Sequence, residues 1–122
     1  MLPAMEWTRA GAAEDFTEGR GRTVRLWGRR VAIFRHEGRL HALDARCPHS
    51  GADLGLGRVD LGRVTCLDHG WTFDLASGRM PGMEENAVRI YPVKEEAGGV
   101  FVSVPAAAGA GTPQEICRRG KR

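Results

Sequence analysis

The chain has 122 residues and a net charge of +3, which suits one domain with a self-supporting core. Residues 1–104 contain 14 basic and 14 acidic side chains, so the excess positive charge belongs to residues 105–122. A nucleic-acid-binding protein would need a basic stripe with interleaved aromatic residues, and the sequence shows none. No run of about 18 apolar residues occurs, and the first residues do not form a signal peptide. We therefore expect no membrane anchor and a cytoplasmic protein.

Short strands separated by glycine turns are predicted along the first half of the chain. A strand is expected around Trp7, followed by a polar stretch with room for one helical turn and then by a strand at 23–27. The dipeptide Glu37-Gly38 is typical of a two-residue hairpin turn. It predicts a hairpin with arms at 30–36 and Arg39–Asp44, and the second arm leads directly to Cys47.

The second half of the chain continues this pattern of strands and glycine turns. The predicted elements are a hairpin of Arg58–Asp60 and Arg63–Thr65 across Leu61-Gly62, a strand at 71–75, and strands at 88–93 and 100–104 joined across Gly98-Gly99. Helix signals are nearly absent. The predicted fold class is therefore all-β, an antiparallel β-sandwich or barrel.

Residues 105–122 differ in composition from the rest of the chain. They are rich in alanine and glycine, then basic, and have no apolar period that could offset the entropy cost of ordering. We expect a folded domain over residues 1–104 and a flexible basic tail over 105–122. Cys117 lies in this tail and is expected to be a free thiol.

Two short segments each supply one cysteine and one histidine. Cys47 and His49 form the first pair, Cys66 and His69 form the second, and sixteen residues separate the pairs. Two thiolates and two imidazoles make a four-ligand set for a metal centre. Zinc-finger spacing usually places both cysteines before both histidines, so this alternating order favours a cluster. Structural zinc in a small interaction module remains an alternative.

With Pro48 inside the first pair and Gly70 after the second, the motif resembles that of Rieske [2Fe–2S] proteins. The flanking residues Gly51, Leu54, Trp71 and Phe73 agree, and the resemblance extends over roughly residues 6–104. It implies one [2Fe–2S] cluster in a small subdomain of two loops at one end of the sandwich. Cys47 and Cys66 would bind one iron, and His49 and His69 would bind the other.

The resemblance also implies that the chain carries electrons. Neither iron of such a centre has an open position for a substrate, so the chain is not expected to be an enzyme itself. High-potential relatives brace the loops with a disulfide at positions that are Ala52 and Asp68 here. Their hydroxyl donors are replaced by Trp71 and Phe73. Fewer hydrogen bonds to the cluster predict a midpoint potential of roughly −150 to 0 mV, the low end for this class.

The expected role is that of a soluble Rieske-type ferredoxin between a flavin-containing reductase and a terminal oxygenase. The alternative is the small subunit of an NAD(P)H-dependent nitrite reductase, which would bind the large subunit. All four ligands are present, whereas that subunit family often lacks some, which favours the ferredoxin. The chain is too short for an added oxygenase domain, and no GxGxxG motif follows a strand, so no site for a nucleotide or flavin is expected.

Three further positions are interpreted from the sequence. Residues 80–83, Met-Pro-Gly-Met, are predicted to form a third loop beside the cluster. His36 and His41 lie on the predicted hairpin strands. We interpret both histidines as ordinary surface or rim residues and not as ligands.

Overall fold

The computed structural model describes residues 7–48, 51–68 and 70–104. Within these ranges, no helix is both long enough and apolar enough to span a membrane. The described helices are two short 3-10 turns, η1 (Ala13–Asp15) and η2 (Leu54–Leu56), and the remaining elements are strands in antiparallel sheets. This confirms the predicted all-β class.

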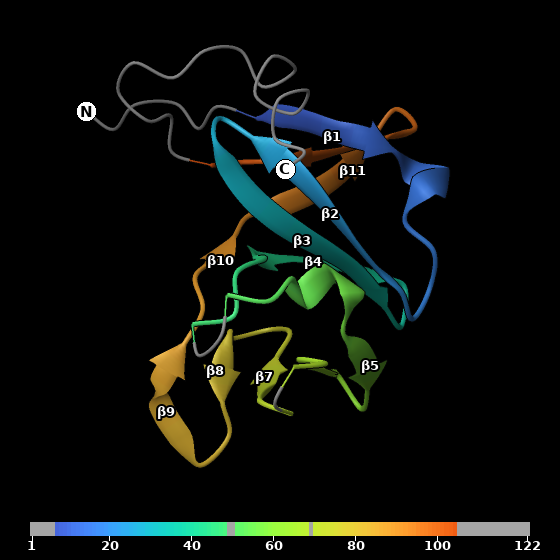
Figure 1. Ribbon diagram of the computed structural model, residues 1–122. Helices are drawn as coiled ribbons and strands as arrows, with labels where there is room; N and C mark the ends of the chain where they lie inside the picture. The colour runs from blue at the N-terminus through green and yellow to red at the C-terminus, as the bar shows by residue number, and fades with distance from the viewer. Residues whose placement is uncertain (1–6, 49–50, 69, 105–122) are drawn as a thin grey trace, which may run out of the picture.

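Two sheets form the larger part of the molecule (Figure 1). The first has the order β1-β12-β11, with β1 (Thr8–Ala12), β12 (Gly99–Val102) and β11 (Val93–Glu96). The second has the order β10-β4-β3-β2, with β10 (Ile90–Tyr91), β4 (Arg39–Asp44), β3 (Arg29–His36) and β2 (Gly21–Leu26). Apolar side chains from both sheets share one core, which includes Val31, Ile33, Val100 and Val102.

Strand β3 contributes to two cores at once because successive side chains of a strand point to opposite faces. Val31 and Ile33 face the first sheet, whereas Ala32 and Phe34 belong to a second core. All four side chains are fully buried. This second core also contains Cys47 and Cys66, so β3 connects the sandwich to the region of the predicted ligands.

The second core is completed by a smaller subdomain, drawn below the sandwich in Figure 1. It contains a three-stranded sheet of β5 (Arg58–Asp60), β6 (Arg63–Thr65) and β7 (Thr72–Asp74). A two-stranded sheet of β8 (Arg79–Met80) and β9 (Met83–Ala87) lies beside it. The sequence prediction of a small subdomain at one end of a sandwich is confirmed.

Most of the predicted strands are found, with four corrections. Strand β2 ends at Leu26 because Trp27 and Gly28 form its turn, both with positive φ angles of 53° and 81°. The predicted strand at 88–93 is two strands, β10 and β11, separated by Pro92. The last hairpin turns at Ala97-Gly98 and not at Gly98-Gly99. The segment at residues 80–83 is the turn of the unpredicted β8–β9 hairpin.

The predicted domain boundary at residue 104 coincides with the last residue that the structure describes. Residues 105–122, with Cys117, fall outside the described ranges. The boundary and the flexible tail therefore remain predictions.

Candidate metal centre

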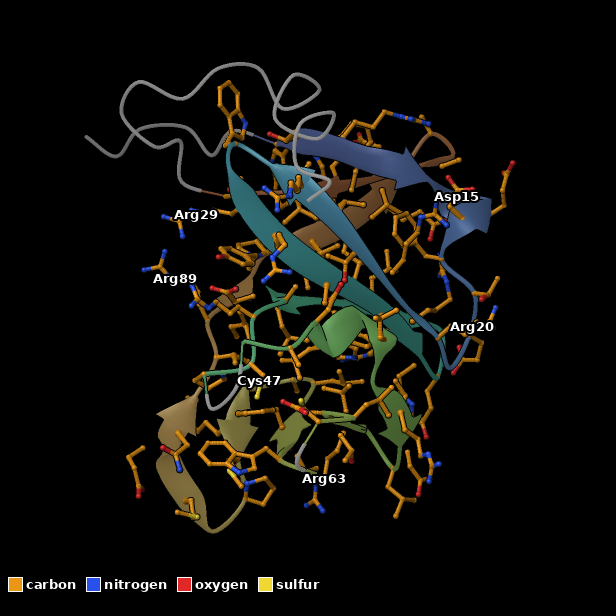
Figure 2. All side chains as sticks on the ribbon, viewed as in Figure 1. Asp15, Arg20, Arg29, Cys47, Arg63 and Arg89 are labelled. Atoms are coloured by element: carbon orange, nitrogen blue, oxygen red, sulfur yellow. The ribbon has the colours of Figure 1, made fainter. Side chains whose placement is uncertain are left out.

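The two cysteines of the motif occupy equivalent places in two loops of the second core. Cys47 follows β4 and Cys66 directly follows β6. Each side chain is only 1% exposed, and both are free thiols in the same buried cluster. Figure 2 places Cys47 between the sandwich and the smaller subdomain.

The backbone of both loops follows the same hydrogen-bonding pattern. The Cys47 N–H donates to the carbonyl of Ala52 at 2.9 Å, and the Gly51 N–H donates back to the Cys47 carbonyl at 2.7 Å. In the second loop, the Cys66 N–H donates to the Trp71 carbonyl at 2.7 Å, and the Gly70 N–H donates to the Cys66 carbonyl at 3.0 Å. Each loop thus folds tightly around its cysteine.

A glycine makes this fold possible in each loop. Gly51 and Gly70 stand four residues after their cysteines and have φ angles of 80° and 77°. This left-handed conformation is unfavourable for residues that carry a Cβ atom. Two glycines at matching positions therefore allow two loops of the same shape, each presenting one cysteine.

Asp53 holds the first loop against the sandwich. One oxygen of its carboxylate, Oδ1, accepts a hydrogen bond from the Thr23 hydroxyl at 2.6 Å and another from the Gly55 N–H at 2.9 Å. The latter bond caps the start of η2. The Leu54 N–H also donates to the Ala45 carbonyl at 2.7 Å, which joins η2 to the segment just before Cys47.

Gly55 is required by the close approach of η2 to strand β2. A Cβ atom at this position would lie 1.9 Å from the Thr23 hydroxyl oxygen, closer than any non-bonded contact. Neither Asp53 nor Gly55 was predicted from the sequence. The order Asp-x-Gly is a turn signal that could have identified the local cap, but not the bond to Thr23.

The second loop is held by the three-stranded sheet. Cys66 and Trp71 stand between the paired strands β6 and β7, and the hydroxyls of Thr65 and Thr72 lie 3.1 Å apart within hydrogen-bond range. Phe73 is fully buried in the second core. Its ring centroid lies 6.4 Å from that of Trp71. Both aromatic rings thus pack in the same core as the thiols.

Exposure changes sharply within each loop. Cys47 and Cys66 are buried, whereas Pro48, Leu67 and Asp68 are exposed, Leu67 by 67%. His49 follows Pro48 and His69 follows Asp68, but both histidines lie outside the described residues. The structure therefore places two of the four predicted ligands, and the role of the histidines remains a prediction.

The predicted third loop is a hairpin turn that contributes to the same core. Met80, at the end of β8, packs against the cluster that contains both cysteines. Pro81 and Gly82, at the tip, are exposed. The segment lies beside the cysteine region and forms the turn between β8 and β9.

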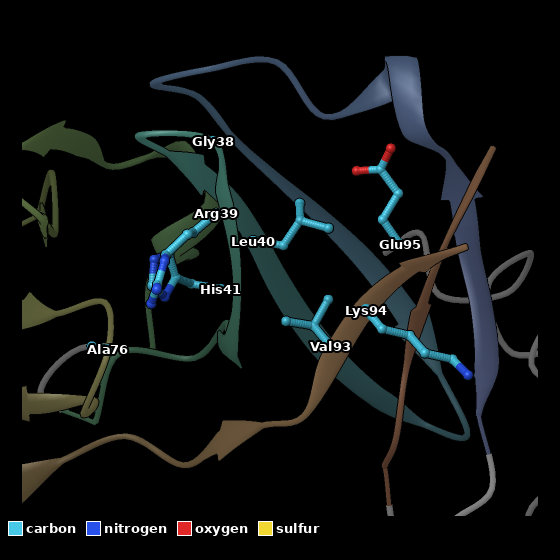
Figure 3. A pocket seen from close by; sticks show the side chains of 8 residues that line it. All are labelled: Gly38, Arg39, Leu40, His41, Ala76, Val93, Lys94 and Glu95. Atoms are coloured by element: carbon cyan, nitrogen blue, oxygen red, sulfur yellow. The ribbon is translucent and has the colours of Figure 1, made fainter. Parts of the chain in front are cut away.

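The other two histidines lie on strands β3 and β4. His41 is half-buried and lines a pocket between β4 and β11, with its side chain next to that of Arg39 (Figure 3). Burial lowers the pKa of His41, and the nearby His36 and Arg39 lower it further. His36 lies 3.8 Å from the carboxylate of Glu37. No residue that lines this pocket belongs to the ligand loops, and the interpretation of His36 and His41 as surface or rim residues stays a prediction.

The described donors fit the cysteine half of a Rieske ligand set. Two buried thiols stand in two loops of the same shape, and a binuclear cluster requires one such pair for one of its irons. Exposed residues follow each thiol, next to the positions where the second pair of ligands is predicted. A fold built around two equivalent single-cysteine loops also differs from a zinc finger, whose cysteines come in adjacent pairs.

Comparison with known proteins identifies the same family. Residues 6–92 match the family model of the Rieske [2Fe–2S] domain. The 3-chlorobenzoate-3,4-dioxygenase oxygenase subunit of Comamonas testosteroni is 41% identical over 108 residues, which cover 79% of this chain but only 25% of that subunit. The ferredoxin component of the alkene monooxygenase system of Xanthobacter autotrophicus is 28% identical over 80% of this chain and 81% of its own length.

A solved structure confirms the fold. The terminal oxygenase of carbazole 1,9a-dioxygenase from Nocardioides aromaticivorans superposes with a TM-score of 0.77 and 28% identity over 84% of this chain and 31% of the oxygenase chain. This chain thus spans about a quarter to a third of the oxygenase chains that it matches. The sequence motif, the paired loops and the family match agree: the chain belongs to the Rieske [2Fe–2S] domain family and binds one [2Fe–2S] cluster.

Proposed function

We propose that this chain is a one-electron carrier of an oxygenase system, with Cys47, His49, Cys66 and His69 as the cluster ligands. The observation that supports this most directly is the pair of equivalent loops, in which each buried thiol is followed by exposed residues. Such an arrangement holds a redox group firmly at its inner side and leaves its outer side near the surface, where a partner can approach.

The cysteines and the histidines would have different roles at the cluster. Cys47 and Cys66 would hold the inner iron within an apolar core, which excludes water from the thiolates. His49 and His69 would hold the outer iron. When bound, the cluster accepts and releases a single electron. The chain would receive that electron from a flavin-containing reductase and pass it to a terminal oxygenase through the exposed side of the loops.

The similarity to a ferredoxin component supports a separate carrier, since each sequence covers about four fifths of the other. The higher identity to an oxygenase subunit favours a second candidate, in which this chain acts as the Rieske part of an oxygenase. In both cases the domain carries single electrons. The two candidates differ in whether the next acceptor lies on another protein.

The side chains near the thiols predict a low midpoint potential. Trp71 and Phe73 carry no hydroxyl, and both pack in the core that contains Cys47 and Cys66. Hydrogen bonds to the sulfur atoms stabilise the reduced, more negative cluster, so fewer of them lower the potential. We expect a midpoint of roughly −150 to 0 mV by direct electrochemistry. A midpoint above about +200 mV would contradict this expectation.

A reconstituted electron-transfer assay tests the proposed function. NADH, a flavin-containing ferredoxin reductase and ferric cytochrome c as the final one-electron acceptor are mixed with increasing amounts of this protein. We expect the rate of cytochrome reduction to rise with the protein concentration. The Cys66→Ser variant, which lacks a cluster ligand, should give only the background rate. No dependence on the cluster-loaded protein would contradict a carrier role.

To separate the two candidates, the reduced protein is mixed with an oxidised Rieske terminal oxygenase, and both EPR signals are followed. Transfer to the oxygenase in repeated turnovers favours the separate carrier. Failure to reduce it, in a protein that still reduces cytochrome c, favours the Rieske part of an oxygenase.

A further inference from the structure

Arginines gather at one end of the second sheet, although the chain as a whole is balanced up to residue 104. Residues 20–46 contain eight arginines and two acidic residues. Across the turn at Trp27-Gly28, Arg25 of β2 pairs directly with Arg30 of β3. Like charges placed opposite each other on neighbouring strands destabilise a sheet. A fold that keeps such a pair has a reason other than stability to concentrate positive charge here.

These arginines surround an open pocket of about 290 Å³, which we name the arginine pocket. Its lining consists of four arginines, one glycine of the turn and a single carboxylate: Arg25, Arg29, Arg30, Arg46, Gly28 and Asp44. The Asp44 carboxylate already accepts a hydrogen bond from the Arg46 N–H at 3.1 Å. The four guanidinium groups thus greatly outweigh the negative charge in the pocket.

The arginine pocket borders the first ligand loop. Arg46 directly precedes Cys47 in the sequence. The Nε atom of Arg46 lies 3.8 Å from the position that a Cβ atom on Gly51 would occupy, so its side chain reaches over the same loop. A partner bound at this pocket would therefore lie against the part of the surface where electron transfer is proposed.

Two buried polar groups lie near the pocket and act on each other, because the Arg29 side chain opposes the rise in the pKa of Tyr91 that burial causes. They are the Nε of Arg29 and the hydroxyl oxygen of Tyr91, a residue that is only 5% exposed. Arg29 and Arg89 project from the same edge of the molecule in Figure 2, and the charges of both act on the Tyr91 hydroxyl. The positive charge therefore extends beyond the pocket lining to Arg89 at this edge of the molecule.

We propose that the arginine pocket binds an acidic segment of the redox partner, with a carboxylate of that segment between the guanidinium groups. This rests on the proposed carrier function. Guanidinium groups bind carboxylates in a bidentate manner, which gives orientation as well as attraction. Because residues 1–104 are neutral as a whole, a concentrated positive patch orients an acidic partner toward the first ligand loop and increases its rate of association. Contacts between redox partners are small and transient, which suits a pocket of this size.

The test measures binding of a twenty-residue polyglutamate peptide by titration calorimetry at low salt. The patch variant carries Arg29→Gln and Arg30→Gln. The control carries Arg22→Gln and Arg58→Gln, which removes the same charge from exposed positions around a different pocket at the other end of β2. We expect the patch variant to weaken peptide binding at least tenfold, and the control less than threefold. Equal losses in both variants would overturn the proposal.

A second variant guards against a folding defect in the first. Arg30→Gln with Arg46→Gln leaves Arg29 beside Tyr91, and its thermal unfolding should match that of the parent protein. We expect the same tenfold loss of peptide binding. If inorganic phosphate binds the parent protein but the peptide does not, the pocket is a small-anion site and the proposal is wrong.

Electron transfer provides the second readout. Stopped-flow oxidation of the reduced protein by ferricyanide, a trianion, should slow at least threefold in the patch variants. Oxidation by tris(phenanthroline)cobalt(III), a trication, should not slow. Loss of the cluster signal in the parent protein would contradict the carrier function. The peptide titration measures binding at the pocket whether or not the cluster is bound. A failure of the pocket proposal can therefore be distinguished from a failure of the carrier function.

Discussion

At the scale of single residues, Asp53 determines how firmly the first ligand loop is held. Its carboxylate caps η2 and accepts a hydrogen bond from the hydroxyl of Thr23, which lies on strand β2. We predict that Asp53→Ala lowers the free energy of unfolding by about 1–2 kcal/mol, because a helix cap and a partly buried hydrogen bond are lost together. Urea unfolding of the cluster-loaded protein measures the change.

The control for this prediction is Asp60→Ala. Asp60 is an exposed carboxylate at the end of β5, and its removal should change the free energy of unfolding by less than about 0.5 kcal/mol. Equal losses for the two variants would show that the cap does not hold the loop. A double variant with Thr23→Val should lose less than the sum of the single variants, because both changes break the same bond.

His41 predicts a dependence of stability on pH. Burial lowers its pKa in the folded protein, so the unfolded chain binds a proton more readily than the folded one. Stability from the neutral imidazole is therefore present above pH 6.5, its ordinary pKa, and is lost as the pH falls below it. We expect His41→Gln to lose less stability than the parent protein between pH 7.5 and 5.0.

Urea midpoints at the two pH values measure this effect. The variant and the parent protein share every other titrating group, so the difference in their slopes isolates His41. Because the side chain is only half-buried, the effect should be small but of this sign. A steeper loss in the variant would contradict the assignment of the shift to burial.

Site residues that depend on local spacing could be predicted from the sequence, whereas those that depend on distant partners could not. The cysteine positions could be predicted because metal ligation demands particular residue types at a particular spacing. The anchoring role of Asp53 could not, because its partner Thr23 is 30 residues away in the sequence. Gly55 could not be predicted for the same reason, because it is the close approach of β2 that leaves no room for a Cβ atom at this position.

At the scale of elements, the hairpin of β5 and β6 contains a correctable strain. Leu61 has a φ angle of 52° in the two-residue turn and is 83% exposed. A left-handed conformation costs a residue with an apolar side chain about 1 kcal/mol, whereas Asn-Gly suits this type of turn. We predict that Leu61→Asn raises the free energy of unfolding by about 0.5–1 kcal/mol.

Thermal unfolding of this variant is compared with that of Leu56→Asn. Leu56 is also largely exposed, at 71%, but its φ angle is not positive. Replacing it should not stabilise the protein. Equal stabilisation by both changes would point to the loss of exposed apolar surface rather than to relief of backbone strain.

Strands with an alternating apolar pattern and a glycine turn were predicted well, and the missed strands have a physical reason. The β3–β4 and β5–β6 hairpins combine alternating strands with a glycine turn, and their positions were nearly correct. Strand β9 contains two glutamates and an asparagine, so it has no alternating apolar pattern. Pro92 cannot donate a ladder hydrogen bond, and it separates the single predicted strand into β10 and β11.

At the scale of the whole molecule, the fold redistributes charge that the sequence balances. Residues 1–104 are neutral as a whole, and the arginines of residues 20–46 are spread over three strands and their turns. Strand pairing brings Arg25 opposite Arg30, and the end of β4 brings Arg46 to the same pocket. The sequence shows that residues 20–46 are rich in arginine, but only the tertiary structure shows which of these arginines share a pocket.

The proposed function requires a [2Fe–2S] cluster held by two cysteines and two histidines. The most direct measurement is an EPR spectrum of the dithionite-reduced protein, with iron and acid-labile sulfide counted on the same sample. We predict a rhombic signal with an average g value below that of the free electron, and two irons and two sulfides per chain. Cys117→Ser should preserve this result, and Cys66→Ser should abolish it. A colourless, EPR-silent protein that contains one zinc per chain would contradict the account.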